Sequence, residues 1–217
     1  MLLSTAYFPP VEYFAAMAKG MTLSADRVIP SIVYIEACEH YQKQSYRNRC
    51  KFYAENGVQT LSVPVVHENG THELPIAEIK VDYSTPWLIR TERAIESAYY
   101  SSPYFEYYRD ELFSILDSRP ETLFALNTAI TQFFIDKTHL PVKMEFTTDF
   151  EPEGSSVHGE DLRNVIHPKK ENDLLERYGL SKPYYQVFAS KSGFIPNLSI
   201  MDLLFNEGPD SLLYLVK

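Results

Sequence analysis

The polar segment at residues 36–49, E-A-C-E-H-Y-Q-K-Q-S-Y-R-N-R, constrains this chain more than any other stretch. It follows an apolar run at residues 31–35 that is typical of a buried strand. Charged side chains are costly to bury unless they are paired or bind a ligand. Ligands of α/β sheets also collect at the C-terminal ends of the strands. We therefore interpret the segment as part of a binding site, with a salt-bridge network as the alternative.

The first third of the chain predicts an α/β fold with a mixed sheet that opens with a βαβ-like unit. Strands are expected at residues 2–6 and 31–35, and the apolar positions of residues 11–17 predict a helix between them. Gly20 is the expected C-cap of that helix. A turn at Glu55-Asn56-Gly57 predicts a β-hairpin between residues 50–53 and 60–66. Further strands are expected at the following positions: residues 76–82, 142–146 and 184–188.

The middle of the chain predicts a run of about three helices within about residues 86–139. Helical periodicity begins at Trp87, resumes after Pro103, and resumes again after residues 118–121, which fit a capping box. Another short helix is expected between Ser199 and Gly208. Residues 151–173 are polar and without periodicity, as in a functional lid or a disordered segment. We expect one domain over residues 1–217.

Composition narrows the classes of function. The formal net charge of −9 argues against non-specific nucleic-acid binding, which needs a basic surface. No apolar run approaches the length of a membrane span, and the N-terminus lacks the pattern of a signal peptide. Cys38 and Cys50 are too few for a disulfide framework. We expect a cytoplasmic protein without a nucleic-acid partner, and the sequence predicts no oligomeric state.

The basic and amide side chains at residues 43–49 suit a nucleotide-sugar-like ligand. Arg47 and Arg49 lie on one side of an extended segment, and each could bind a phosphate through two N–H groups. Glu36 or Glu39 could orient these arginines or act as a catalytic general base. A solvated strand edge with Arg–Glu pairs is the alternative. The predicted substrate-binding residues are Tyr7, Lys43, Arg47, Asn48, Arg49 and Asn197.

Other reactive side chains favour a structural interpretation. Cys38 and His40 could touch in a strand, but a buried cysteine usually behaves as a small hydrophobe. His67, His72 and Glu73 flank an expected turn, where exposed histidines are commoner than metal ligands. We therefore expect no metal site, and no cofactor is indicated. His158 and His167 lie in the polar segment, where either could be a catalytic base carried on a lid.

Several blocks of sequence, in order, resemble the WbqC-like protein family over nearly the whole chain. The blocks are YFPP (residues 7–10) with YF (13–14), QKQSYRNR (42–49), LSVPV (61–65), AIESAY (94–99) with SPYF (102–105), and NLSIMDLLFNEGP (197–209). The chain departs from the family's pattern at Thr91-Glu92, where many members have His-Trp, and at Ala6-Tyr7, where many have Gln-Pro. If that histidine is a catalytic base in the family, this chain is altered or inactive.

The resemblance implies a role in surface-polysaccharide (O-antigen) biosynthesis. Members of the family are associated with gene clusters in which aminosugar nucleotides are made and acylated. The function it implies is a cytoplasmic transferase that adds an acyl or aminoacyl group to an activated aminosugar. Two alternatives stay open: a non-catalytic binding or scaffold protein of such a pathway, and a nucleotidylyltransferase-like enzyme.

Overall fold

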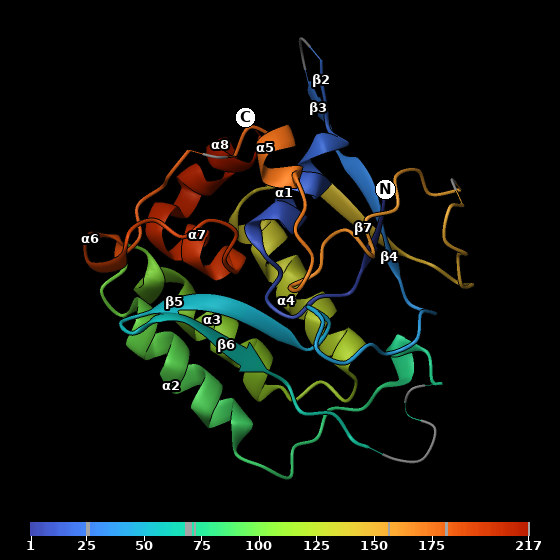
Figure 1. Cartoon of the computed structure of the whole chain (residues 1–217), viewed down its shortest axis with the longest axis horizontal. Helices are drawn as coiled ribbons and strands as arrows, with labels where there is room; N and C mark the ends of the chain where they lie inside the picture. The colour runs from blue at the N-terminus through green and yellow to red at the C-terminus, as the bar shows by residue number, and fades with distance from the viewer. Residues whose placement is uncertain (25–26, 68–70, 72, 156, 181, 217) are drawn as a thin grey trace.

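The computed structural model describes residues 1–24, 27–67, 71, 73–155, 157–180 and 182–216. It shows the predicted mixed α/β fold, with a parallel sheet beside a group of helices and an antiparallel hairpin (Figure 1). The sheet has the order β1-β4-β7, and its strands are β1 (Leu2–Ser4), β4 (Ser31–Glu36) and β7 (Val142–Phe146). All three strands are parallel, so their C-terminal ends lie at one edge of the sheet.

Helix α1 (Val11–Lys19) lies between β1 and β4 in sequence and completes the predicted βαβ-like opening. Its N-cap, Pro10, has an extended backbone, and its C-cap is Gly20, as predicted. Gly20 is favoured there by a close approach, because a Cβ would lie 2.6 Å from the Cβ of Ser31 at the start of β4. The residues of α1 from Val11 to Ala18 are buried, so the helix is enclosed by the rest of the fold.

The predicted hairpin is formed by β5 (Arg49–Ala54) and β6 (Gly57–Ser62), so the second strand ends earlier than expected. Gly57 has a φ of +97°, which a residue with a side chain rarely adopts. Alternation places Cys50 and Phe52 of β5 in the core, while Arg49 and Lys51 are only half-buried. The hairpin therefore presents two cations on the face that points away from the core.

The three predicted helices are α2 (Trp87–Tyr99), α3 (Phe105–Asp117) and α4 (Leu123–Lys137). The capping box predicted at residues 118–121 is wrong. Thr122 is the N-cap of α4, and its hydroxyl accepts a hydrogen bond of 3.2 Å from the backbone N–H of Ala125. Ser118 instead ends α3 and donates to the carbonyl of Ile115.

The C-terminal part of the chain is helical. It contains α5 (Leu174–Arg177), α6 (Ala189–Ser192), α7 (Ile200–Glu207), the 3₁₀ turn η2 (Gly208–Asp210) and α8 (Ser211–Leu215). Helix α7 begins after Ser199, whose hydroxyl accepts from the N–H of Met201, and Gly208 follows its last residue, as predicted. Residues 200–206 are all buried, so α7 joins the same hydrophobic core as α1 and α4.

Two strand predictions are wrong. Residues 76–82 form the 3₁₀ turn η1 (Ile76–Glu78) and two isolated bridges rather than a strand. Residues 184–188 form no strand, because the side chains of Tyr184 and Gln186 hydrogen-bond Asp202 on α7. A short hairpin of β2 (Thr22–Ser24) and β3 (Arg27–Ile29) was not predicted.

The described part of the polar segment at residues 151–173 packs onto the sheet. The N–H of Leu2 donates to the carbonyl of Glu160 at 2.9 Å, and the N–H of Leu162 donates to the carbonyl of Leu2 at 3.0 Å. Leu162 and Ile166 are buried in the core. These contacts hold the segment against β1, and Arg163 of the segment reaches the predicted site residue Glu36.

Candidate functional site

Glu36, a predicted base, is the last residue of β4 and is fully buried. Its Oε2 lies 2.9 Å from Nη1 of Arg163 and accepts the backbone N–H of Glu151. Its Oε1 accepts from the hydroxyl of Thr147 at 2.6 Å and from the N–H of Cys38 at 3.0 Å. Both oxygens are therefore engaged by protein donors.

Glu39 and Arg47, also predicted, form a second buried pair. Nε of Arg47 lies 2.9 Å from Oε1 of Glu39, and Nη2 contacts Oε2. The hydroxyl of Ser4 donates to Glu39 at 3.0 Å and accepts from Arg47 at 2.8 Å. Burial raises the pKa of Glu39, and Arg47 opposes that effect. The Arg47 guanidinium is therefore bound to protein groups.

The other predicted residues lie in different surroundings. Lys43 is exposed, whereas Tyr7 is fully buried among core side chains. Asn48 donates its side-chain amide to the carbonyl of Val63 at 3.2 Å. Asn197 accepts the N–H of Glu12 at 3.0 Å. The structure thus brings Glu36, Glu39 and Arg47 to one edge of the sheet, where the guanidinium of Arg47 is bound to Glu39.

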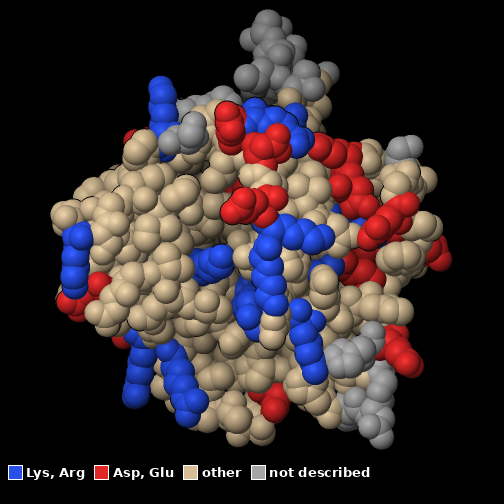
Figure 2. Space-filling model, in the orientation of Figure 1, with Lys and Arg blue, Asp and Glu red and all other residues tan. Residues whose placement is uncertain are grey.

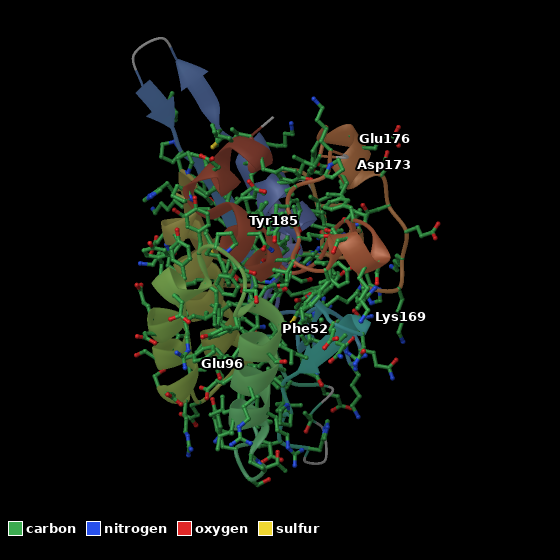
Figure 3. All side chains as sticks on the ribbon, turned by 90° about the vertical axis from the view of Figure 1, so that its left-hand side faces the viewer. Phe52, Glu96, Lys169, Asp173, Glu176 and Tyr185 are labelled. Carbon is green, nitrogen blue, oxygen red and sulfur yellow. The ribbon has the colours of Figure 1, made fainter. Side chains whose placement is uncertain are left out.

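A cleft of about 770 Å³ lies beside the β5–β6 hairpin. Its walls are Lys51 of β5, residues 167–172 and residues 195–198. A smaller hollow of about 130 Å³ shares Tyr46, Lys51 and Lys169 with this cleft and adds Arg49. We call the two together the basic cleft. Figure 3 shows Lys169 beside the β5–β6 ribbon.

Four cations of the basic cleft form no ion pair with a described residue: Arg49, Lys51, Lys169 and Lys170. Lys51 and Lys170 donate to the backbone carbonyls of Pro168 and Asn164, at 3.3 and 3.1 Å, and Lys169 contacts the side-chain oxygen of Gln44. All three partners are uncharged. Figure 2 shows Lys and Arg side chains gathered near the middle of this face. The cleft is therefore electropositive on a chain of net charge −9.

Glu12 is a buried carboxylate that lines the basic cleft. It belongs to the first turn of α1. Burial raises the pKa of Glu12, while hydrogen bonds from Asn197 and Asn172 and the charge of Lys51 lower it. Exposed Glu171 is a second acid in the lining. A ligand in the cleft would thus meet several cations and one desolvated carboxylate.

His167 also lines the cleft. Burial lowers its pKa, and the nearby charges of Lys170, Arg47 and Lys169 lower it further. Its Nδ1 accepts the N–H of Lys169 at 3.2 Å, so the neutral ring carries its proton on Nε2. In this form, His167 is a hydrogen-bond donor rather than a base.

Of the predicted substrate-binding residues, Arg49 and Asn197 line the basic cleft. Lys51 belongs to the same basic patch of the sequence as Arg49 and lies two residues after it, so strand alternation places both on one face. Lys169 and Lys170 form a visible basic pair, but nothing local connects them with β5. Glu12 carries no signal in the sequence, because an acid in the first turn of a helix is common.

The remaining candidate side chains lie in different surroundings. Burial raises the pKa of the Cys38 thiol, and His40 is exposed. Among the described residues, no group of three or more His, Cys, Asp or Glu side chains could hold a metal ion. His72 lies outside the described residues. Thr91 is buried on α2 beside Tyr7. Within the described part of the chain, no helix has the length and apolar character that crossing a bilayer requires.

Comparisons with known proteins place the chain in a family. It is 27% identical over 199 residues to "Uncharacterized protein Rv1507c" of Mycobacterium tuberculosis (strain ATCC 25618 / H37Rv), covering 80% of this chain and 84% of that protein. No solved structure matches the chain. The sequence profile of the WbqC-like protein family matches residues 5–179, which include α1, β4, the β5–β6 hairpin and Lys51, Lys169 and Lys170 of the basic cleft. The chain therefore belongs to the WbqC-like protein family.

Proposed function

We propose that the basic cleft binds a phosphate-bearing, nucleotide-sugar-like molecule. The observation that carries this proposal is the group of four cations around the basic cleft, Arg49, Lys51, Lys169 and Lys170, which form no ion pair with a described residue. Charged hydrogen bonds from guanidinium and ammonium groups to phosphate are among the stronger polar contacts in proteins. The volume of about 770 Å³ is within the usual range for small-molecule and cofactor sites.

We further propose a cytoplasmic transferase of surface-polysaccharide biosynthesis that acylates an activated aminosugar. The sugar nitrogen would attack the carbonyl carbon of an activated acyl donor, and the donor's leaving group would depart with its bonding electron pair. Glu12 would take the proton lost by nitrogen, because it is the buried carboxylate in this cleft and burial raises its pKa. The base roles of Glu36 and Glu39 stay predictions, and their ion pairs make Glu12 the better-placed base.

The binding proposal is tested by calorimetric titration with a uridine diphosphate aminosugar. We expect the wild type to bind and the double variant Lys51→Ala/Lys169→Ala to bind about a hundredfold more weakly, because two charged contacts to phosphate are lost. The control is Lys80→Ala, which removes an exposed lysine paired with Glu121. Equal affinity in the double variant and the control would contradict the assignment of this cleft.

A non-catalytic binding or scaffold protein is the second candidate. The observation that favours it is that both predicted bases, Glu36 and Glu39, are held in buried ion pairs. The two functions differ in turnover. If the wild type binds the aminosugar nucleotide but forms no acylated product with any activated acyl donor, and Glu12→Gln leaves binding unchanged, the scaffold function is favoured.

A further inference from the structure

The three-stranded sheet has one covered edge and one open edge. At the β1 edge, the N–H of Leu2 donates to the carbonyl of Glu160, and the N–H of Leu162 donates to the carbonyl of Leu2. At the opposite edge, β7 pairs with β4 on one side, and no strand of the described chain pairs with its other side. All five residues of β7 are half-buried or exposed, whereas most residues of β4 are buried. Strand β7 is therefore an open edge strand.

The backbone groups that β7 leaves unused belong to Met144 and Phe146. The N–H of Thr147 donates to the carbonyl of Ile35 on β4 at 3.1 Å. Alternate residues of a parallel strand bond to the same neighbour, so every second residue before Thr147 also faces β4, and the N–H and C=O groups of Met144 and Phe146 point away from it. A row of such groups is a template for pairing with another strand.

The side chains of β7 make this edge complementary to itself. Its sequence is V-K-M-E-F, with Lys143 and Glu145 placed symmetrically about Met144. Both charged side chains lie on one face of the strand, and Nζ of Lys143 lies 2.8 Å from Oε1 of Glu145. The Lys143 side chain is 69% exposed and that of Glu145 is 34% exposed. Another molecule can therefore reach both charges.

Antiparallel pairing of two copies of β7, centred on Met144, satisfies both charges. Lys143 then lies directly opposite Glu145 of the second copy, and the two-fold symmetry of the pair repeats this contact. These positions are non-hydrogen-bonded pairs of the ladder, in which side chains approach most closely. Centring the ladder on Lys143 or on Glu145 would instead place like charges opposite each other, which is destabilising. The charges therefore select one register.

Apolar side chains favour the same register. Phe146 is 44% exposed, and the pairing places it opposite Val142 of the second copy. Cross-strand pairs of an aromatic and a β-branched residue are favourable. Ile32 of β4, which lies beside Lys143 on the same face of the sheet, is 49% exposed. The sheet next to this edge thus carries apolar surface that is open to a partner.

We infer that the chain forms a symmetric dimer in which the β7 strands of two copies pair antiparallel and join two three-stranded sheets into one. Met144 of each copy exchanges two backbone hydrogen bonds with Met144 of the other. The partner is a second copy rather than an unrelated strand, because the order of charges in β7 is complementary to itself. The described walls of the basic cleft contain no residue of β7, so the dimer is independent of the function proposed above.

Sedimentation equilibrium at several protein concentrations measures the dimer dissociation constant. We expect the wild type to dimerise. Lys143→Glu and Glu145→Lys should each raise the dissociation constant at least about tenfold, because each substitution places like charges opposite each other at two positions. Lys191→Glu is the control, since it inverts an exposed lysine that is paired with Glu55 away from β7, and it should leave the constant unchanged.

Mixing the two variants tests the register itself. A ladder between one Lys143→Glu chain and one Glu145→Lys chain opposes unlike charges at both positions, so the mixture should form a heterodimer. If either single variant does not fold, the double variant Lys143→Glu/Glu145→Lys should dimerise like the wild type, because it exchanges the two charges. The inference is overturned if the wild type is monomeric at the highest concentration measured, if the folded single variants dimerise as tightly as the wild type, or if neither the mixture nor the double variant restores the dimer.

Discussion

The guanidinium of Arg163 lies 2.9 Å from the carboxylate of Glu36, although the two residues are 127 positions apart in the chain. Glu36 ends β4, and Arg163 belongs to the polar segment that packs on the sheet. Asp161 binds the same guanidinium through Nε and Nη2. The buried charges at this edge of the sheet thus connect the segment with the strand.

Glu36→Gln should destabilise the fold by about 1–3 kcal/mol, because Arg163 loses one buried charged partner but keeps Asp161. Urea unfolding at pH 7 measures this change. Glu121→Gln is a suitable control, since Glu121 forms an exposed pair with Lys80 that is worth at most about 1 kcal/mol. A loss in Glu36→Gln no larger than in this control would show that the buried pair is unimportant to stability.

Substitutions of Arg47 and Lys51 should affect different properties: the first should lower stability, and the second should weaken ligand binding. Arg47→Ala should lower the free energy of unfolding by about 3–5 kcal/mol, because the carboxylate of Glu39 would be left buried and unpaired. Lys51→Ala should change stability by about 0.5 kcal/mol or less but weaken binding of a nucleotide sugar by about tenfold. Urea unfolding and calorimetry of both variants test this separation, and the reverse pattern would contradict it.

His167 should make ligand binding depend on pH. Its pKa is lowered, so the ring is neutral at pH 7 and gains a positive charge only below its usual range. Affinity for a uridine diphosphate sugar should therefore rise as the pH falls below 6.5, the ordinary pKa of histidine, because the diphosphate keeps its charge while the cleft becomes more positive. His167→Gln should show a smaller rise. Equal pH dependence in the variant and the wild type would exclude this role.

Asp202 should make stability depend on pH. Burial raises its pKa from 3.8 to about 6. The folded state therefore binds more protons than the unfolded state between these values, so stability falls as the pH rises through this range, by about 3 kcal/mol. Urea unfolding of the wild type and Asp202→Asn at pH 4 and pH 7 measures this contribution. The wild type should lose that much stability relative to the variant, and a constant difference would contradict the assignment.

The elements that sequence predicted correctly are those specified by local signals. The hairpin follows from the turn before Gly57, and α1 follows from its proline start and its glycine end. The strand prediction at residues 184–188 was wrong. Tyr184 and Gln186 follow the alternation of a strand, but their side chains hydrogen-bond Asp202, which is distant in sequence. Alternation alone cannot reveal such tertiary partners.

The residues of the candidate site also divide into those with a local sequence signal and those that depend on tertiary packing. Arg49 and Lys51 could be singled out because they belong to one dense basic patch of the sequence. The same patch also contains Arg47, whose partner Glu39 lies only eight residues away, but the depth of that pair depends on how the chain packs around it. Lys169 and Glu12 reach the cleft only through the fold, so their sequence neighbours carry no information about the site.

The central claim is that the basic cleft holds phosphate, and a crystal structure of the protein with uridine diphosphate N-acetylglucosamine tests it most directly. The diphosphate should lie within hydrogen-bond distance of Lys51 and Lys169, with the sugar toward Glu12. A diphosphate bound at another surface, or crystals that show the cleft empty at saturating ligand, would contradict this claim.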